Sequence, residues 1–493
     1  MKSVSRRSFV TDMAAVPFAL WMQNERIPTP ARRKVWVRYE ARTPKGRKML
    51  RIYADTVKKM MNATAAGDPR SWIFQWYTHA VRPDRTKAGE ISSIYGSGSS
   101  PHKTLAQDAW NTCEAHFGPN ETSFLPWHRM FVYFLEAIVR KASGKHEFSL
   151  PYWNYSVSGS AHGVIPPEFT KASDPTYQWL YRANRNPGVN NGAPIDANDP
   201  GALNLDALKE STYAPNGAAS GFNMGLDFGL HGNVHVDTGD STNMGAIPWA
   251  ARDPIFWLHH CNLDRLWASW NKNGGANPGG SWLTTTFTFA DLNGNKVVGT
   301  VKDFDDLSKL DYTYDRFEPP PLKFIPLPRP FEVAHPRPLL VYELAEVPLT
   351  AEAVRLQMAP AKTPAGPAEG FTEHVANLPP DKHVYLVIKK LRANTYPGVV
   401  YQVFLDLPSG RSLKEADAHR LGRVNFFEAV THQEGAPGEQ EMPRFLSFEI
   451  TDVVKGLQAN KLLQDKPVVT IVPAGTPAAD AKPAVGDVSI VEQ

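Results

Sequence analysis

The chain has 493 residues, which is long for a single hydrophobic core and predicts roughly two or three domains. Its 53 Lys and Arg residues nearly balance its 50 Asp and Glu residues, and no basic stripe carries interleaved aromatic residues, so we expect no nucleic-acid partner. The two cysteines, Cys113 and Cys261, exclude a disulfide framework but leave one bridge between them as an alternative.

The first residues predict a twin-arginine-type export signal over residues 1–30. The stretch SRRSFV (residues 5–10) resembles such a signal and precedes a short apolar run that contains Asp12. That run is too short to cross a bilayer, and no later segment reaches the roughly 18 apolar residues of a membrane helix, so we expect no membrane partner. The signal predicts a periplasmic or secreted protein that folds around a cofactor before export; the alternative is a flexible basic terminus.

Helical patterns dominate residues 31–320. Apolar residues in 48–63 recur at helical spacing. Asp68-Pro69 is predicted to cap and open a helix over SWIFQWYTHA, and Asp253-Pro254 to open another over DPIFWLHHCNLDRLW. A Gly-, Asn- and Pro-rich stretch at about 155–225 predicts long loops with short helices.

The pattern changes after a Pro-dense linker, which we place at residues 321–345. Stretches such as HVYLVIKKL, GVVYQVFLDL and KPVVTIVPA carry β-branched and aromatic residues with partial alternation. The predicted architecture is therefore a mainly α domain over 31–320, a β-sandwich over 346–475 and a flexible tail over 476–493.

Three histidines of the helical domain suggest a metal site. His231 and His235 are four residues apart, which places both rings on one helical face. His260 lies on the later helix and shares a core-directed face with Phe256, Leu263 and Trp267. Three neutral imidazoles without a carboxylate or thiolate suit copper or zinc rather than magnesium or calcium.

A second set of three histidines lies upstream: His79, His116 and His128. Two such sites would suit two metal ions about 3.5–4 Å apart that share a small ligand. Copper is redox active whereas zinc is not, and two Cu(I) ions could deliver two electrons to O2.

The stretches FLPWHRMFVYFLE (124–136) and DPIFWLHHCNLDRLW (253–267) resemble the two copper signatures of the tyrosinase and polyphenol oxidase (catechol oxidase) family, the type-3 dicopper proteins. The resemblance spans roughly 70–320 and implies a four-helix-bundle dicopper core with long loops. It implies that His79, His116 and His128 bind one copper and that His231, His235 and His260 bind the other. In the family pattern the second histidine of the adjacent pair is the ligand, which makes His259 a packing neighbour that needs another partner.

The C-terminal stretches, among them FFEAVTH and KPVVTIVPAG, resemble the β domain of plant-type polyphenol oxidases. That resemblance implies an intramolecular cover over the active-site mouth and a latent enzyme.

Several positions depart from the family pattern. Met130 replaces the usual Pro, and Pro83 stands where plant-type enzymes often carry a cysteine cross-linked to a copper ligand. Cys113 lies three residues before His116 instead, which argues against that thioether.

Three further positions are candidates for shaping the reaction. Gly232 stands where hydroxylating members tend to have Asn, which favours diphenol oxidation and leaves monophenol hydroxylation open. Ile247 falls where some relatives carry a bulky residue over the first copper, and Asp227 is the counterpart of an acid thought to hold a water.

Buried charges complete the site prediction. Asp264 either accepts a hydrogen bond from a ligand imidazole or forms a salt bridge with a nearby Arg. Arg129 and Glu136 are interpreted as structural charges.

The predicted function is oxidation of small o-diphenols to o-quinones with two copper ions and O2. Alternatives are an o-aminophenol oxidase and a hemocyanin-like oxygen-binding protein. A dizinc hydrolase is disfavoured, since no Asp or Glu stands at ligand spacing.

Overall fold

The computed structural model describes residues 34–113, 122–321, 335–342, 346–361, 370–408, 416–430 and 445–493, and every structural statement below concerns these residues. The predicted export signal and His116 lie outside them. Within the described part of the chain, no helix is long and apolar enough to span a bilayer.

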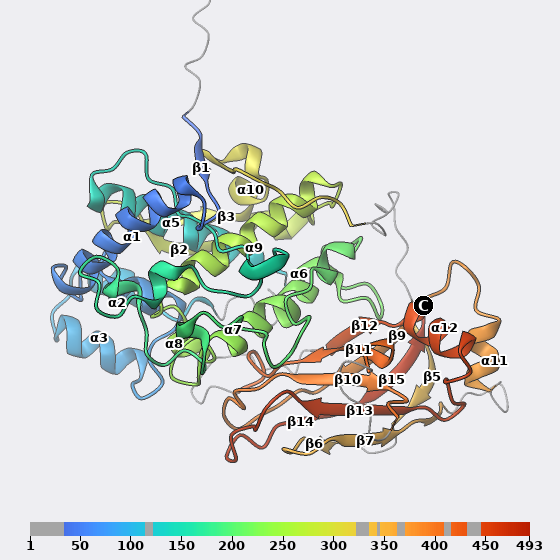
Figure 1. Cartoon of the computed structure of the whole chain (residues 1–493). Coiled ribbons are helices and arrows are strands. Elements are labelled where there is room, and N and C mark those ends of the chain that lie inside the picture. The colour runs from blue at the N-terminus through green and yellow to red at the C-terminus, as the bar shows by residue number, and fades with distance from the viewer. Residues whose placement is uncertain are drawn as a thin grey trace, which may run out of the picture. The chain divides into compact units, whose positions relative to one another are not determined.

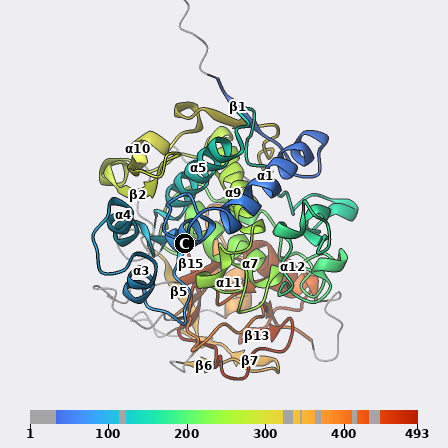
Figure 2. The ribbon, with the colours of Figure 1, turned by 90° about the vertical axis from the view of Figure 1, so that its left-hand side faces the viewer.

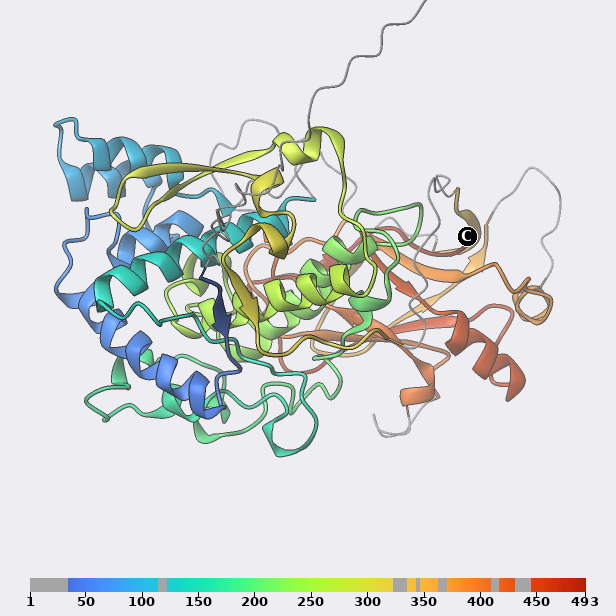
Figure 3. The same ribbon diagram turned by 90° about the horizontal axis from the view of Figure 1, so that it is seen from above.

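Three long helices form the centre of the first domain: α1 (Pro44–Asn62), α5 (Phe124–Ser143) and α9 (Ile255–Lys272) (Figure 1). Helix α5 packs against both α1 and α9, as two further views show (Figure 2, Figure 3). The helix expected over 48–63 is confirmed as part of α1, whose buried face includes Leu50, Tyr53 and Val57.

The start of α2 (Trp72–His79) differs from the prediction. Ser71 caps this helix, because its Oγ accepts from the Phe74 N–H at 3.1 Å. The Asp68 carboxylate is engaged by the backbone and side chain of Arg70 instead, in a turn that precedes the helix. The start of α9 agrees better, since Asp253 Oδ1 accepts from the Ile255 N–H at 3.1 Å.

Shorter elements complete this domain, and the long-loop prediction is confirmed by five single 3-10 turns between residues 159 and 209. The remaining helices are α3 (Lys87–Tyr95), α4 (Pro101–Ala109), α6 (Gly221–Gly225), a π-helical turn η8 (Leu226–His231), α7 (Gly232–Thr238), α8 (Ile247–Ala250) and α10 (Val301–Phe304). Strands β1 (Trp36–Arg38) and β4 (Tyr312–Tyr314) pair in parallel, and β2 (Thr286–Ala290) and β3 (Lys296–Thr300) form a hairpin.

The second domain contains two sheets whose side chains share one apolar core, which confirms the β-sandwich. One sheet has the order β11-β10-β13-β7 and the other β12-β9-β15-β5-β8, with β14 and β6 as a separate pair. The strands are β5 (Arg337–Val341), β6 (Val347–Pro348), β7 (Val354–Gln357), β8 (Ala359–Pro360), β9 (Val384–Lys389), β10 (Tyr401–Leu405), β11 (Arg420–Val424), β12 (Phe445–Glu449), β13 (Val468–Pro473), β14 (Ala484–Val485) and β15 (Val488–Glu492). Two helices accompany them, α11 (Phe371–Ala376) and α12 (Thr451–Ala459).

Two predicted boundaries are wrong. Residues 476–493 are no flexible tail, because β15 lies between β9 and β5 and buries Val488 and Ile490. The linker predicted to extend to residue 345 overlaps β5, which is hydrogen-bonded to β15. In both places a short strand was not predicted, because Pro- and Ala-rich residues flank it in the sequence.

Candidate metal centre

Five helical segments carry five of the six predicted histidines. His79 is the last residue of α2, His128 lies in the first turns of α5, His231 and His235 lie on η8 and α7, and His260 lies on α9. All five side chains are buried. The predicted sixth, His116, lies outside the described residues.

These side chains form two groups that touch. The ligand atoms of His79, Cys113 and His128 lie within 4.8 Å of one another, and so do those of His231, His235, His259 and His260. The rings of His128 and His260 stack at a centroid distance of 4.1 Å, which joins the groups. The predicted pairing of an upstream and a downstream histidine set is thus present for five of its six members.

Backbone carbonyls orient three of the imidazoles. His128 Nδ1 donates to the Phe124 carbonyl at 2.9 Å, His231 Nδ1 to the Asp227 carbonyl at 3.1 Å and His235 Nδ1 to the Met244 carbonyl at 2.9 Å. A proton on Nδ1 leaves the lone pair on Nε2, the atom that would bind a metal.

Unsatisfied nitrogens supply the test for a metal. Nε2 of His231, Nε2 of His235 and both ring nitrogens of His260 are buried and have no hydrogen-bond partner among the described residues. Burying such groups is costly unless something coordinates them. The donor set therefore fits a nitrogen-binding transition metal.

The same surroundings keep the imidazoles neutral. Burial lowers the pKa of His231 to about 3 and lowers the pKa of His235 well below its ordinary value. For His260, burial lowers the pKa and the neighbouring His128 lowers it further. Neutral imidazole is the ligand form, so the site is ready to bind metal across the physiological range.

His259 lacks the partner that the sequence analysis expected. Neither of its ring nitrogens has a hydrogen-bond partner among the described residues, and its ring lies parallel to that of His231 at 5.5 Å. Geometry alone thus places both His259 and His260 in the downstream group. The ring of His260, however, is the one that stacks on His128 across the two groups.

Cys113 was not predicted to lie among the ligand candidates. Its Sγ lies 3.7 Å from His128 Nε2. Cys261 instead lies on α9 with its Sγ 3.5 Å from the Leu150 carbonyl, and the two cysteines form no disulfide with each other. The sequence signal for Cys113 was its position three residues before His116, which the metal interpretation did not use.

Of the two roles left open for Asp264, the salt bridge with a nearby arginine is confirmed, and the alternative contact with a ligand imidazole is not the one that the described residues show. Its carboxylate contacts Arg129 Nε, Arg38 Nη1 at 3.1 Å and the Tyr312 hydroxyl at 2.7 Å. Arg38 Nε in turn pairs with Glu136 Oε2 at 2.8 Å, which confirms Arg129 and Glu136 as structural charges. Asp264 lies one helical turn beyond His260 and faces α5 and β4 rather than the histidines.

The C-terminal domain contributes side chains directly at the histidines. Phe427 stacks on His235 at 4.1 Å and meets the edge of His231 at 5.5 Å. It is buried within the core of the helical domain. No sequence signal indicated which aromatic residue of FFEAVTH would enter the site.

The same domain also contacts each predicted shaping residue. The Tyr396 hydroxyl accepts from the Ile247 N–H at 3.2 Å, and Asn425 lies against Gly232. Asp227 Oδ1 lies 3.0 Å from His231 Nδ1, and the ligand atoms of Asp227, His231 and Glu428 lie within 4.8 Å of one another. Glu428 was not predicted.

An ion pair joins the domains away from the histidines. Arg423 of β11 donates to both oxygens of Asp199 at 2.9 Å, and both side chains are buried. Burial raises the pKa of Asp199, and Arg423 opposes that rise.

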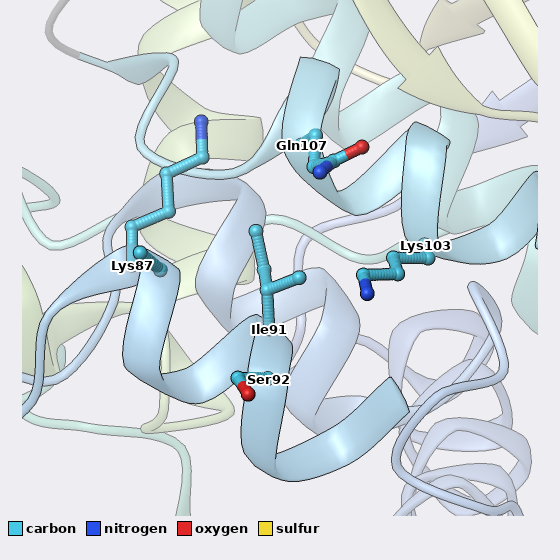
Figure 4. Close-up of a pocket in the computed structure, with 6 residues that line it drawn as sticks. Lys87, Ile91, Ser92, Lys103 and Gln107 are labelled. Atoms are coloured by element: carbon cyan, nitrogen blue, oxygen red, sulfur yellow. The ribbon is translucent and has the colours of Figure 1, made fainter. Parts of the chain in front are cut away.

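A cavity of about 490 Å³ between α3 and α4 is not part of this centre (Figure 4). It contains no histidine, and its two lysine ammonium groups donate to backbone carbonyls. Its lining residues are Lys87, Ala88, Ile91, Ser92, Lys103 and Gln107.

Comparison with known families divides the chain in two. Residues 69–273 match the common central domain of tyrosinase. Residues 342–493 match a domain of unknown function, DUF7868, which includes β15 and so agrees with the corrected C-terminal boundary.

Curated relatives include a tyrosinase, HcTyr1, from a Hahella strain, with 31% identity over 53% of this chain and 59% of the relative. Chloroplastic polyphenol oxidase A1 of Vicia faba is 31% identical over 55% of this chain and 46% of its own length. The match thus spans about half the length of these two relatives. The chloroplastic polyphenol oxidase of Malus domestica is 24% identical over 91% of this chain and 76% of the relative.

Two solved structures share the arrangement of both domains. A latent aurone synthase superposes with a TM-score of 0.60 at 21% identity, covering 94% of this chain and 90% of the other. Latent apple tyrosinase gives 0.59 at 22% identity, covering 94% and 98%. At these identities the likeness establishes the fold.

Proposed function

We propose that the chain is a member of the tyrosinase and polyphenol oxidase family of type-3 dicopper proteins, because its residues 69–273 match the common central domain of tyrosinase, and that it oxidises o-diphenols to o-quinones with O2. His79 and His128, with the undescribed His116, would hold one copper ion, and His231, His235 and His260 the other. Bound copper supplies the redox couple that carries electrons from the phenol to O2. The observation that carries the proposal is the set of buried ring nitrogens without partners in the downstream histidine group, which touches the upstream group through the stacked rings of His128 and His260.

The substrate class follows from what surrounds the histidines. The Phe124 ring centroid lies 4.7 Å from that of His128 and the Phe256 ring centroid lies 4.2 Å from that of His260, so aromatic side chains pack against a histidine of each group. Phe427 already places an aromatic ring on His235 at 4.1 Å. We infer that a small phenolic ring would take the place of the Phe427 ring.

Three residues are assigned supporting roles in this proposal. Asp227 Oδ1 contacts His231 Nδ1 at 3.0 Å and so orients that imidazole, and it is the candidate for holding a water that takes up the phenol proton. Gly232 and Ile247 border the downstream histidines and would shape the ring that enters.

We further propose that the enzyme is latent. The Phe427 side chain occupies the place on His231 and His235 that a substrate ring would need. Val400 and Phe427 both pack into the core of the helical domain, so closure is stabilised by apolar burial.

Oxygen uptake tests both proposals. Copper-loaded protein with an engineered protease site in the Pro-rich segment 321–334 is assayed with 4-methylcatechol before and after cleavage. We expect quinone formation with O2 consumption, increased by cleavage. Preference for an o-aminophenol would instead support the aminophenol oxidase, and reversible O2 binding without quinone would support the oxygen carrier. Equal activity before and after cleavage on bulky phenols would contradict latency.

The destination of the protein is a separate proposal. We propose export by the twin-arginine route, supported by the SRRSFV stretch at residues 5–10. Replacing Arg6 and Arg7 with Lys should retain the protein inside a bacterial host. Unchanged export would contradict this route.

A further inference from the structure

Gly232 and Asn425 fit against each other at the domain interface. A Cβ atom added at Gly232 would lie 2.4 Å from Asn425 Oδ1 and 2.7 Å from its Cγ and Nδ2. The amide of the C-terminal domain therefore occupies the space that any side chain at position 232 would need.

Hydrogen bonds hold the Asn425 amide in that place. Its Nδ2 donates to the Phe228 carbonyl at 2.7 Å and to Asn233 Oδ1 at 3.0 Å. Its Oδ1 accepts from the Phe427 N–H at 3.2 Å. The side chain is 3% exposed, so it cannot move aside without leaving buried polar groups unsatisfied.

The Phe228 carbonyl, which accepts from Asn425, lies in an irregular part of the helix. Residues Leu226–His231 form a π-helical turn, and Gly229 has non-helical angles of φ −92° and ψ −106°. π-turns insert an extra residue into a helix and interrupt its regular hydrogen-bond ladder. The C-terminal domain thus completes the backbone bonding of the segment that carries His231.

We infer that Gly232 and Asn425 are a size-matched pair that controls how tightly the C-terminal domain closes over the metal centre. The pair acts beside Phe427, which covers the histidines, and the inference rests on the latency proposed above. The missing side chain at position 232 is therefore a requirement for closure and not only a determinant of substrate preference.

Amide hydrogen exchange on full-length, copper-free protein tests the pair without an activity readout. In Gly232→Ala, peptides covering 420–430 should exchange about tenfold faster, because overpacking an interface costs enough to open it. Gly456→Ala is the matched control, since a Cβ on that helical glycine meets nothing within 4 Å. Unchanged exchange of α1 peptides verifies that the helical domain remains folded.

The double variant gives the sharpest result. Asn425→Gly alone should speed exchange, because three hydrogen bonds are lost. In the double variant, exchange should be slower than in Gly232→Ala alone, because Asn425→Gly removes the side chain that overlaps the new Cβ atom. If Gly232→Ala exchanges like the wild type, or if the two effects simply add, the pair does not control closure.

A separate arm isolates the latency proposal. Phe427→Ala should raise oxygen uptake by copper-loaded, uncut protein. If it does not, latency fails regardless of the exchange data. If it does and Gly232→Ala leaves exchange unchanged, latency stands and the size-matched pair fails.

Discussion

Individual imidazoles at the centre are distinguished by their contacts rather than by their position in the sequence. The four-residue spacing in the sequence correctly predicted that the His231 and His235 side chains lie together, because residues four apart share a helical face. Spacing could not separate His259 from His260, since both rings turn out to be buried in the same group. Cys113 escaped notice because its proximity to His128 depends on tertiary packing.

Copper content separates the two adjacent histidines. The His260→Ala variant should lose about half of the bound copper, because the His260 ring joins the two groups in the wild type. The His259→Ala variant should keep both ions. Elemental analysis of dialysed, copper-loaded protein measures the difference. Loss of copper in His259→Ala alone would reverse the assignment.

Loss of the Asp264 carboxylate should weaken the helical domain. Asp264→Asn leaves Arg38 and Arg129 buried with one carboxylate fewer, which should cost about 3 to 5 kcal/mol of unfolding free energy. Urea unfolding followed by tryptophan fluorescence checks this value. Asp84→Asn, in an exposed pair with Arg82, is the control and should leave the transition midpoint unchanged.

The same carboxylate gives a pH dependence. Burial alone would raise the pKa of Asp264, but Arg129 and Arg38 lower it below its ordinary value. A lowered pKa contributes stability that is present above the unfolded-state value of about 4 and is lost as pH falls through the folded-state value. The unfolding free energy of the wild type should therefore fall more steeply in acid than that of Asp264→Asn. Parallel pH profiles would contradict this.

Secondary-structure elements were predictable where a long periodic pattern existed. Helix α1 and the opening of α9 by Asp253 follow from apolar spacing and capping chemistry. The start of α2 was misplaced because Asp68 and Ser71 are both good caps, and only the turn around Arg70 decides between them. Strand β15 was missed because five residues after a Pro- and Ala-rich stretch give too short a pattern.

Strand β15 should be essential for the C-terminal domain. Ile490 is fully buried between two neighbouring strands, so Ile490→Ala should cost about 2 to 5 kcal/mol and raise activity without cleavage. Unfolding curves and oxygen uptake report the two effects. Val298→Ala is the control, because that strand residue is 52% exposed. A wild-type unfolding curve for Ile490→Ala would show that β15 is dispensable.

At the scale of the whole molecule, the division into a helical and a β domain followed from the change of pattern, and the resemblance predicted a cover. Neither the change of pattern nor the resemblance predicted which residues of the C-terminal domain contact the metal centre. Phe427 and Glu428 reach the histidines, and Asn425 reaches the neighbouring Gly232, only because the two domains pack against each other. Such long-range contacts leave no local periodicity in a single sequence.

The Arg423–Asp199 pair should stabilise closure. Arg423→Gln leaves Asp199 buried with its main ionic partner removed, which should weaken docking by about 3 kcal/mol. In a titration of uncut, copper-loaded protein with a mild detergent, the variant should then begin to consume O2 at a lower detergent concentration than the wild type. Arg392→Gln, in an exposed pair with Glu346, is the control. An activation profile for Arg423→Gln that matches the wild type would remove this pair from the closing mechanism.

Metal stoichiometry probes the two touching histidine groups most directly. Full-length protein is loaded with copper, dialysed and subjected to elemental analysis together with a protein determination. Two touching groups of buried histidines, of which the downstream group carries ring nitrogens without hydrogen-bond partners among the described residues, predict two copper ions per chain. A value of one ion per chain, or a stable preference for zinc, would contradict a dicopper centre.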